Sequence, residues 1–383
     1  MQHRVSDLFH LQMGKTPSRN QLEYWENGSN KWISISDLSN CSMYTAETKE
    51  AITDCAVRET NIRLVPKNTV IMSFKLSIGK TAITSEPVYT NEAIMAFINK
   101  GEELVLPEFL YYQLLSKDWG STGNRAVMGA TLNKASLSQM KIYVPSLQEQ
   151  RGIVQVLGHI DSQLKRTNES VNKLNDLVKS RFVEMFGALL KNGKGQTLED
   201  ISELITVGIA NAATHAYADK GTTMFRNLNI HENHLDDTDL ITIRPEFAEK
   251  YKKKALKSGD ILVTRTGYPG VACIVPEKYA GCQTFTTLIV RLDTRSGASA
   301  TFVSQYINSP LGKEYVNKMK AGSSQQNFGA TSLKSMPIVI PPLALQQEFA
   351  DFVTQVDKLR FATQQQIDKL ETLKKSLMQE YFG

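Results

Sequence analysis

The sequence predicts an α/β (α+β) protein in which two similar globular domains are joined by two long antiparallel helices that form a coiled coil, with a pseudo-two-fold internal repeat. Three observations predict this architecture. Residues 145–187 align without a gap with residues 341–383, at an offset of 196. In both segments apolar residues recur in steps of three and four, which is typical of a coiled-coil seam. The stretches before both segments share shorter patterns of strands, glycine turns and helices.

Length and composition are consistent with such a plan. A chain of 383 residues is long enough for two or three domains, and 41% hydrophobic with 22% charged residues is an ordinary soluble composition. We find neither an apolar run near the ~20 residues that span a bilayer nor a signal peptide, and therefore expect a cytoplasmic protein without a membrane partner. The four cysteines form no CxxC pair and predict neither a zinc site nor disulfides.

The first globule is expected over residues 1–144. The stretch VIMSFKLSIGKTAI, from Val70, predicts a strand, a turn at Gly79 and a second strand. FLYYQLL at 109–115 predicts a short amphipathic helix, and the apolar strand MKIYVP precedes the first long helix.

The second globule, residues 191–340, repeats these features. ISELI at 201–205 matches VSDLF at 5–9, and ILVTRTGYPGVACI aligns Gly270 with Gly79. FVSQYIN at 302–308 corresponds to the first short helix, and the triplet GAT recurs before the apolar strand MPIVIP. NIHENHLDDTDL suggests a polar loop or hairpin, and KYKKKALK suggests an exposed helix face that could also contact phosphate.

The helical segments are residues 145–190 and 341–383, with helices expected at roughly 148–186 and 344–382. Both begin just after proline, and at ~1.5 Å per residue each is about 55–60 Å long. The central seam positions are Ile160, Leu164, Thr167, Val171 and Leu174 in the first helix, and Val356, Leu359, Thr363, Ile367 and Leu370 in the second. If the helices pack antiparallel, the two threonines meet at the pseudo-two-fold axis and fix the register. The alternative is that both are tolerated without pairing.

Motifs for catalysis or nucleotide binding are missing. GKTPSR, residues 14–19, resembles the end of a P-loop, but Phe9 stands where the first glycine is needed and Pro17 opposes a helix start at Thr16. We find no adenine methyltransferase loop, GxGxxG, HExxH or GxSxG. His231 and His234 could place two metal ligands together, but the surrounding polar loop disfavours this. We therefore predict no catalytic residues and no metal.

The net charge permits a polyanionic partner without demanding one, and its distribution shows which part of the chain such a partner would meet. The helical segments carry 11 basic and 11 acidic residues together, so the whole net charge of +5 lies in the globules. Any phosphate-facing surface should therefore belong to the globules.

Candidate DNA contacts are polar or basic residues in predicted loops, since Arg, Asn and Gln fit base edges and Lys more often meets phosphate. In the first globule they are Lys15, Thr16, Ser18, Arg19, Lys75, Lys80, Asn124 and Arg125. In the second they are Arg226, Asn227, Arg265, Thr266, Tyr268, Gln325, Gln326 and Asn327. For any one of them the competing interpretation is a solvated loop residue.

The order of globule, P-x-L-x-x-Q helix start and long helix ending in Phe-Gly, present twice, resembles the specificity subunit of type I restriction-modification systems (HsdS family). GKTPSRNQLEYWENGSNKWISISDL resembles the start of a target recognition domain, and MFRNLNI with LKSGDILVTRTGYPG resembles the equivalent strands of the second. The resemblance covers the whole chain. The second globule, however, opens VGIANAATHAYADKGTTMF and lacks the Gly-Lys-Thr-Pro loop.

The resemblance implies that each domain reads one half of a bipartite, asymmetric double-stranded DNA site while the helices set the spacer. It implies a non-catalytic subunit without its own cofactor, docked to two modification (methyltransferase) subunits and two restriction (motor and nuclease) subunits. S-adenosylmethionine, Mg and ATP would belong to those partners, which supply adenine-N6 methylation and DNA cleavage. The alternatives are the specificity subunit of a type IIB-like or methylation-only system, a coiled-coil scaffold that binds no DNA, and a stand-alone enzyme.

Overall fold

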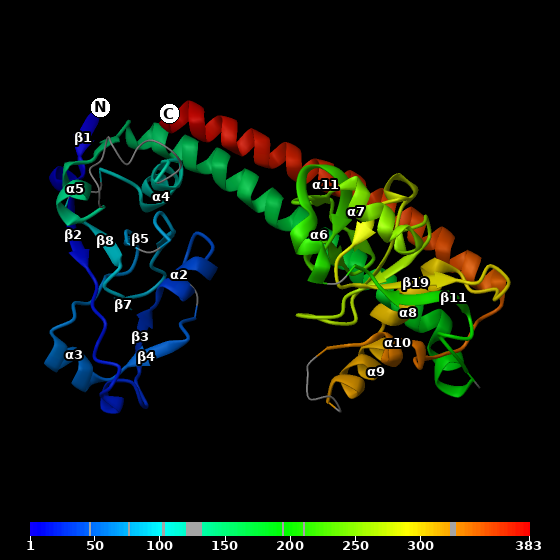
Figure 1. Cartoon of the computed structure of the whole chain (residues 1–383). Coiled ribbons are helices and arrows are strands. Elements are labelled where there is room, and N and C mark those ends of the chain that lie inside the picture. The colour runs from blue at the N-terminus through cyan, green and yellow to red at the C-terminus, as the bar shows by residue number, and fades with distance from the viewer. Residues whose placement is uncertain are drawn as a thin grey trace. The chain divides into compact units, whose positions relative to one another are not determined.

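The computed structural model describes residues 1–45, 47–75, 77–101, 104–119, 132–193, 195–209, 211–321 and 327–383. The chain divides into two compact units. Unit 1 comprises Met1–Asn168 and Gln365–Gly383, and unit 2 comprises Glu169–Gln364. Both chain termini therefore belong to unit 1 (Figure 1).

Unit 1 contains short strands and helices followed by the first part of a long helix. In chain order they are β1 (Gln2–Arg4), α1 (Val5–Leu8), β2 (Phe9–Met13), η1 (Leu22–Tyr24), β3 (Asn30–Ile33), α2 (Ile35–Asn40), β4 (Glu50–Ile52), α3 (Asp54–Thr60), β5 (Val70–Ser73), β6 (Thr81–Ile83), β7 (Tyr89–Thr90), β8 (Ile94–Asn99), α4 (Pro107–Leu115), α5 (Lys134–Gln139), β9 (Lys141–Tyr143) and α6 (Leu147–Asn192).

Unit 2 contains a similar set, which ends in the second long helix. In chain order they are β10 (Gln196–Thr197), β11 (Ser202–Val207), η2 (Asn211–Ala216), β12 (Tyr217–Phe225), η3 (Asn227–Asn229), β13 (Ile230–His231), β14 (His234–Leu235), β15 (Ile241–Ile243), α7 (Pro245–Lys250), η4 (Lys252–Lys254), β16 (Ile261–Val263), β17 (Ala272–Ile274), η5 (Glu277–Tyr279), β18 (Gln283–Thr284), β19 (Leu288–Leu292), α8 (Ala300–Asn308), α9 (Pro310–Ala321), α10 (Ala330–Lys334), β20 (Pro337–Ile338) and α11 (Leu343–Phe382).

The sheets of the two units have the same topology, which confirms the repeat. The four-stranded antiparallel sheets run β2-β8-β5-β6 and β11-β19-β16-β17. The three-stranded sheets run β4-β3-β7 and β15-β12-β18, and each joins one antiparallel to one parallel strand pair. The pairs β1-β9 and β10-β20 are also equivalent, whereas the β13-β14 pair of unit 2 has no counterpart among the described sheets of unit 1.

Each unit has its own hydrophobic core between the four-stranded sheet and its helices. In unit 1, Phe9, Phe97 and Phe109 are buried together with residues of β5 and α4. In unit 2, Phe182 of α6 packs against Phe349 of α11 with ring centroids 5.4 Å apart, and α8 contributes a further phenylalanine to the same cluster. Burying a phenylalanine side chain stabilises a fold by about 1.5–3 kcal/mol, so these rings fix the helices to the sheets.

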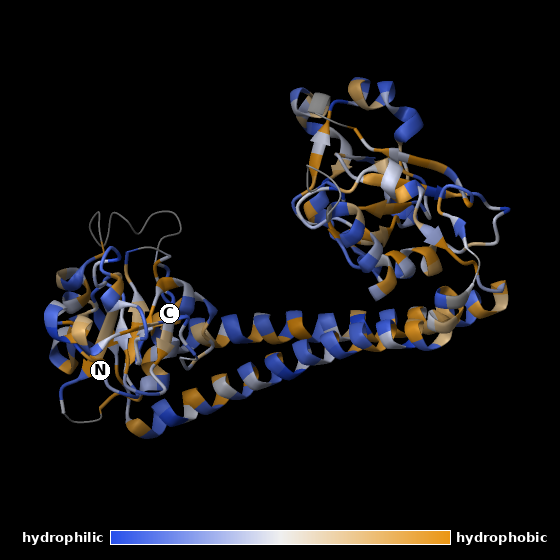
Figure 2. Cartoon of the chain, turned by 90° about the horizontal axis from the view of Figure 1, so that it is seen from below, coloured by the Kyte–Doolittle hydropathy of each residue, from blue (hydrophilic) through white to orange (hydrophobic). Residues whose placement is uncertain are grey.

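One of the two long helices extends past its expected end, and the other matches its expected bounds. Helix α6 continues to Asn192, six residues beyond the expected end, whereas α11 begins and ends within one residue of the expectation. Hydrophobic and hydrophilic residues alternate along both helices in Figure 2. Among the residues that the structure describes, no helix combines the length and the apolar character that a bilayer crossing requires.

Within each unit the parts of α6 and α11 run antiparallel. In unit 1, Asp161 of α6 forms an ion pair with Lys374 of α11 at 2.5 Å, and Phe382 at the end of α11 packs on Phe109 in the core to which the start of α6 contributes. In unit 2, Arg181 of α6 pairs with Glu348 near the start of α11 at 2.9 Å. The expected antiparallel pairing is thus present in both units.

The seam prediction is wrong at Leu359, which is 57% exposed. Alternating steps of four and three from Val356 lead to Arg360 and Thr363, so Leu359 lies outside the stripe. Arg360 takes the inward position and lies with Gln305 in a polar pocket. Among the other seam residues Ile160, Thr167, Val356 and Ile367 are buried, and Leu164, Val171, Leu174, Thr363 and Leu370 are half-buried.

The two seam threonines bond to their own helices. The Thr167 hydroxyl donates to the carbonyl of Gln163 at 2.8 Å, and the Thr363 hydroxyl donates to that of Leu359 at 2.8 Å. Their pairing with one another stays a prediction.

A buried glutamine holds each long helix to its sheet domain. The Gln150 Oε1 accepts from the backbone N–H of Leu106, the residue that caps α4, at 2.9 Å, and its Nε2 donates to the carbonyls of Leu104 and Pro145. Gln346 repeats this pattern in unit 2 with Ser299, Gly297 and Pro341. Both glutamines are 0% exposed. These bonds explain why the P-x-L-x-x-Q helix start contains glutamine.

The match of VSDLF to ISELI at an offset of 196 is wrong. The N–H of Val5 donates to Met140 at 2.9 Å, and it is Leu198 that makes the equivalent bond, to Met336 at 2.9 Å. VSDL therefore corresponds to LEDI, at an offset of 193. A β-bulge between Ser202 and Leu204 shifts the register again in the following strand. Insertions of this kind are invisible in an ungapped comparison.

The glycine of the opening loop is present in both units. The N–H of Lys15 donates to the carbonyl of Thr90, and that of Ile209 donates to the carbonyl of Thr284, both at 2.8 Å. Gly208 is therefore the counterpart of Gly14. A Cβ atom on either glycine would overlap the carbonyl oxygen of that threonine, so neither position accepts a side chain.

We predict that Gln346→Ala lowers the free energy of unfolding by about 1–3 kcal/mol, because it leaves a buried N–H and two carbonyls without partners. Gln347→Ala is the matched control, since Gln347 is exposed at the next position of the same helix. Urea unfolding of both variants measures the difference, and equal stabilities would contradict the role given to Gln346.

We predict that Gly208→Ala destabilises the protein by about 1–3 kcal/mol, because the added methyl group meets backbone atoms that cannot withdraw. Gly152→Ala should instead stabilise it by ~1 kcal/mol, because Gly152 lies in α6 with no atom within 4 Å of an added Cβ. Thermal unfolding of the two variants should give shifts of opposite sign.

Candidate nucleic-acid interface

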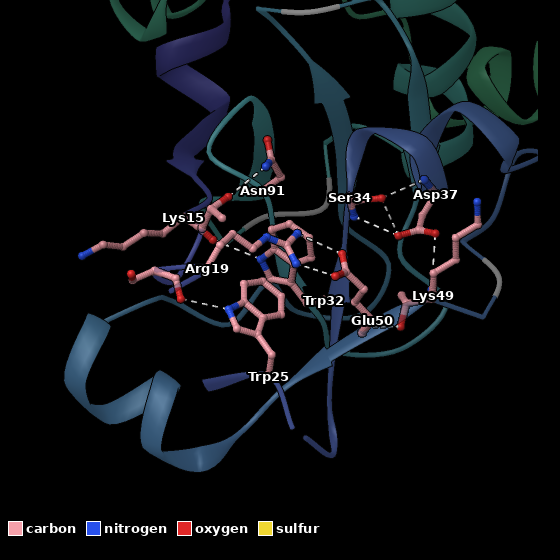
Figure 3. Close-up of polar contacts among 12 residues, drawn as sticks. Lys15, Arg19, Trp25, Trp32, Ser34, Asp37, Lys49, Glu50 and Asn91 are labelled. Atoms are coloured by element: carbon pink, nitrogen blue, oxygen red, sulfur yellow. Dashed lines mark hydrogen bonds and ion pairs between the residues drawn. The ribbon is translucent and has the colours of Figure 1, made fainter. Parts of the chain in front are cut away.

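The opening loop of unit 1 is bonded to its surroundings along its length. The Lys15 ammonium donates to the carbonyl of Thr60 at the end of α3, where a positive charge is favourable to the helix dipole. The Lys15 carbonyl accepts from the indole N–H of Trp32 at 3.0 Å (Figure 3). Lys15 therefore has a structural role, although it is exposed.

Thr16 and Ser18 also form hydrogen bonds with neighbouring segments. The Thr16 hydroxyl donates to Glu92 and accepts from the Asn91 amide at 2.9 Å. The Ser18 carbonyl accepts from the indole N–H of Trp25 at 3.1 Å. Pro17 between them is buried. The loop is thus a fixed connection between β2 and the following turn.

Arg19 lies between aromatic and acidic side chains (Figure 3). Its guanidinium carbon stands 3.8 Å from the centre of the Trp25 ring, and its two terminal nitrogens bond to the Glu50 carboxylate, one of them at 2.9 Å. The hydrogen bond to Glu50 raises the pKa of the Arg19 guanidinium above its usual value. The side chain is 49% exposed, so the guanidinium still reaches solvent although Glu50 occupies one edge and Trp25 lies against one face.

Sequence reasoning missed the partners that position this loop, namely Trp25, Trp32 and Glu50. Figure 3 also shows the capping box of α2, in which Ser34 is the N-cap and the Asp37 carboxylate accepts from the Ser34 hydroxyl at 2.7 Å. The Ser-x-x-Asp spacing is a capping-box signal that the sequence does contain.

A glycine turn of the same construction lies between β5 and β6 and between β16 and β17. The hydroxyl of Ser73 donates to the carbonyl of Ser77 and accepts from the N–H of Lys80. In the second turn the hydroxyl of Thr264 donates to the carbonyl of Tyr268 and accepts from the N–H of Val271. The two predicted turns are thus equivalent, and the residues that they present can be compared directly.

In unit 1 this turn presents Lys75 and Lys80, both exposed. The Lys75 ammonium lies 5.4 Å from the centre of the Phe74 ring, and within the described residues neither ammonium group has a carboxylate partner. A Cβ on Gly79 would collide with Trp119, which explains the glycine. Two unpaired lysines on one turn suit a phosphate contact.

In unit 2 the turn joins the segment after β12. The Asn227 amide donates to the hydroxyl of Thr266 at 2.6 Å, and the Tyr268 hydroxyl donates to the carbonyl of Asn227 at 3.1 Å. The carbonyl of Arg265 accepts from the N–H of Phe328 at 3.0 Å. The structure thus brings Asn227 together with Arg265, Thr266 and Tyr268, although Asn227 lies about 40 residues earlier in the sequence.

The remaining candidates are placed as follows. Arg226 precedes this cluster and forms an ion pair with Asp239 at 2.8 Å. Asn327 is half-buried beside Phe328. Asn124, Arg125, Gln325 and Gln326 lie outside the described residues.

The lysine-rich run and the histidine pair have other partners. Lys254 donates to the carbonyls of Val207 and Gly208, and Lys252 pairs with Glu249. His231 and His234 face one another across the β13–β14 hairpin, as the polar stretch suggested. Over the described ranges, no group of three or more His, Cys, Asp or Glu side chains is arranged to hold a metal ion.

Comparison with known families gives a match over both halves of the chain. The family model described as the type I restriction modification DNA specificity domain matches residues 1–176 and again residues 194–372. The two matches correspond to the two halves of the repeat.

A similar protein over nearly the whole length is the type I restriction enzyme MjaIX specificity subunit of Methanocaldococcus jannaschii. It is 26% identical over 404 aligned positions, which cover 98% of this chain and 90% of that protein.

Two solved structures share the fold. The S subunit of the type I restriction-modification system from M. genitalium has a TM-score of 0.53 at 13% identity, and the alignment covers 100% of this chain and 96% of that one. A chain from a study of complex assembly and conformational transition of the type I R-M system has a TM-score of 0.55 at 14% identity, with coverages of 100% and 97%.

The repeated fold, its paired long helices and the double match of the family model lead to one conclusion: the chain belongs to the family of type I restriction-modification DNA specificity proteins, as a specificity subunit with two target recognition domains.

Proposed function

We propose that the two recognition domains, one in each unit, read the two halves of a bipartite, asymmetric double-stranded DNA site. The observation that carries this proposal is the pair of equivalent glycine turns. They have the same backbone construction, but one presents two lysines and the other Arg265, Thr266 and Tyr268. Two equivalent sites with different side chains are what recognition of two different half-sites requires.

The long helices are proposed to set the distance between the half-sites and to bind partner subunits. Several apolar side chains on them are between 41% and 66% exposed: Val156, Leu177, Val183, Leu359, Phe361 and Leu373. In unit 1, Val156 and Leu373 line an open depression of about 520 Å³ between α6 and α11. Exposed apolar surface of this kind is typical of sites where another protein binds.

The partners are proposed to be two modification subunits and two restriction subunits. The chain itself would perform no chemistry, and S-adenosylmethionine, Mg and ATP would be bound by the partners. Adenine-N6 methylation and cleavage would follow from where the chain places those partners on DNA. Because the substrate is cellular DNA, we place the complex in the cytoplasm.

A modification complex of another type, without a translocating motor, would use the same recognition chain. The genes beside this one distinguish the two, because a separate ATP-dependent motor subunit belongs to a type I system.

We predict that a host carrying this chain with its modification partner methylates adenine in one bipartite motif, and that deletion of this chain abolishes that methylation. Single-molecule sequencing of both strains measures it. An unchanged methylome would favour the coiled-coil scaffold, and methylation by the chain alone would favour a stand-alone enzyme.

We also predict that inserting four residues, about one helical turn, into both α6 and α11 lengthens the unread spacer and leaves both half-sites unchanged. The same methylome sequencing detects it. Substituting four exposed residues in each helix without changing its length is the control, and a spacer that stays the same after insertion would refute the role of the helices.

A further inference from the structure

Unpartnered polar atoms concentrate beside the glycine turn of unit 2. Within the described residues, seven buried side-chain nitrogen or oxygen atoms lack a hydrogen-bond partner, and three of them are Arg226 Nε, Asn227 Oδ1 and Arg265 Nε. Arg226 and Asn227 are consecutive, and Asn227 is bonded to Thr266, the neighbour of Arg265. Buried polar groups are normally bonded, so this concentration is unusual and makes the surroundings of the turn a candidate for ligand contact.

The unpartnered atoms include both donors and an acceptor, and this combination indicates which class of ligand fits. The arginine nitrogens are donors, whereas the amide oxygen is an acceptor. A phosphate group offers only acceptors, but the major-groove edge of a base pair offers acceptors together with an amino donor. The set therefore fits a base edge better than the DNA backbone.

The cluster is held in place, and although its unpartnered atoms are shielded from solvent, other parts of the side chains that carry them are exposed. Thr266 and Tyr268 bond to the side chain and the backbone of Asn227, and Phe328 fixes the backbone of Arg265. Asn227 and Arg265 are half-buried, and Tyr268 is 48% exposed. The Arg265 guanidinium makes no ion pair with any described residue. Side chains pre-positioned in this way contact a ligand with little further loss of conformational freedom.

The same place in unit 1 has different chemistry. The parallel strand pair Ile33–Thr90 is equivalent to the pair Phe225–Thr284. Two residues further along the chain, Ile35 is therefore the counterpart of Asn227. From the matched glycine turns, Phe74 is the counterpart of Arg265. Two apolar side chains thus replace an amide and a guanidinium, and the unpartnered cluster belongs to one recognition domain only.

We propose that Asn227 and Arg265 contact base edges in the half-site read by the second recognition domain, with Thr266 and Tyr268 as positioning residues. The inference rests on the proposed function and adds which side chains determine one half of the specificity. Arg265 suits the two acceptors of guanine, and Asn227 suits the acceptor and donor of adenine.

The test uses the full chain in complex with its modification partner. Asn227→Asp replaces the amide by a group that only accepts, and Arg265→Gln removes the guanidinium. Each should relax or change one base position of one half-site in the methylome. Binding to duplexes that differ at that position should lose about 5- to 150-fold of its discrimination, the equivalent of one lost base contact.

Two controls accompany these variants. Arg295→Gln removes an arginine that is 88% exposed. Arg295 follows β19 and so lies at the end of the sheet opposite the turn. The DNA motif methylated with this variant should be unchanged. Lys80→Gln in the first domain should weaken binding to all sequences equally and lower the salt dependence, because a phosphate contact carries no sequence information.

Thr266→Val and Tyr268→Phe protect the test against misfolding, since each removes one hydroxyl with little change in shape. Both should loosen the same base position as Asn227→Asp, to a smaller degree. If both half-sites stay unchanged in all four variants, this inference is wrong while the proposed function stands. The same holds if the Asn227 and Arg265 variants lose binding equally to all sequences. If the unaltered chain directs no bipartite methylation, the proposed function fails and this inference with it.

Discussion

The hydrogen bonds of one buried glutamine in each unit are the constraint on which the arrangement depends. Gln150 and Gln346 join three things that are otherwise separate: the cap of a short helix, the loop before it and the proline that precedes the long helix. Because the long helix begins within this bonded group, its direction relative to the sheet is fixed at its first turn. The aromatic contacts of Phe182 with Phe349 and of Phe109 with Phe382 hold the same helices at further points.

This constraint leaves the loops at the other end of the sheet free to diverge. The strand order is the same in both units, and the serine or threonine that builds each glycine turn is retained. What differs is the side chains on the turn and the segment that packs against it. The separation of a bonded scaffold from variable loops is a common way to place recognition residues, since loops tolerate substitution while the scaffold holds their position.

Much of the fold could be predicted from the sequence because the repeat is strongest where packing is strictest. The long helices, the glycine turns and the short helices α4 and α8 are where their apolar patterns place them. Leu359 was misplaced because leucine and arginine both occur near the seam, and only the polar pocket around Gln305 explains why Arg360 faces inward.

The opening loop shows what a single sequence cannot reveal. Lys15 and Arg19 look like free cations, but their partners, Thr60 and Glu50, lie more than 30 residues away in sequence. The correspondence of Gly14 and Gly208 is hidden because a bulge and different neighbours separate their sequence contexts. Conversely, Asn227 and Thr266 become one cluster only when strands distant in sequence bring them together.

The division of the chain into units has a consequence for synthesis on the ribosome. Unit 2 is continuous, whereas unit 1 needs the last 19 residues, Gln365–Gly383, and buries Phe382 of that segment against Phe109. The domain that is made first is therefore completed last, after the second domain can already have folded. Until then the first domain exposes the apolar surface that this segment of α11 will cover.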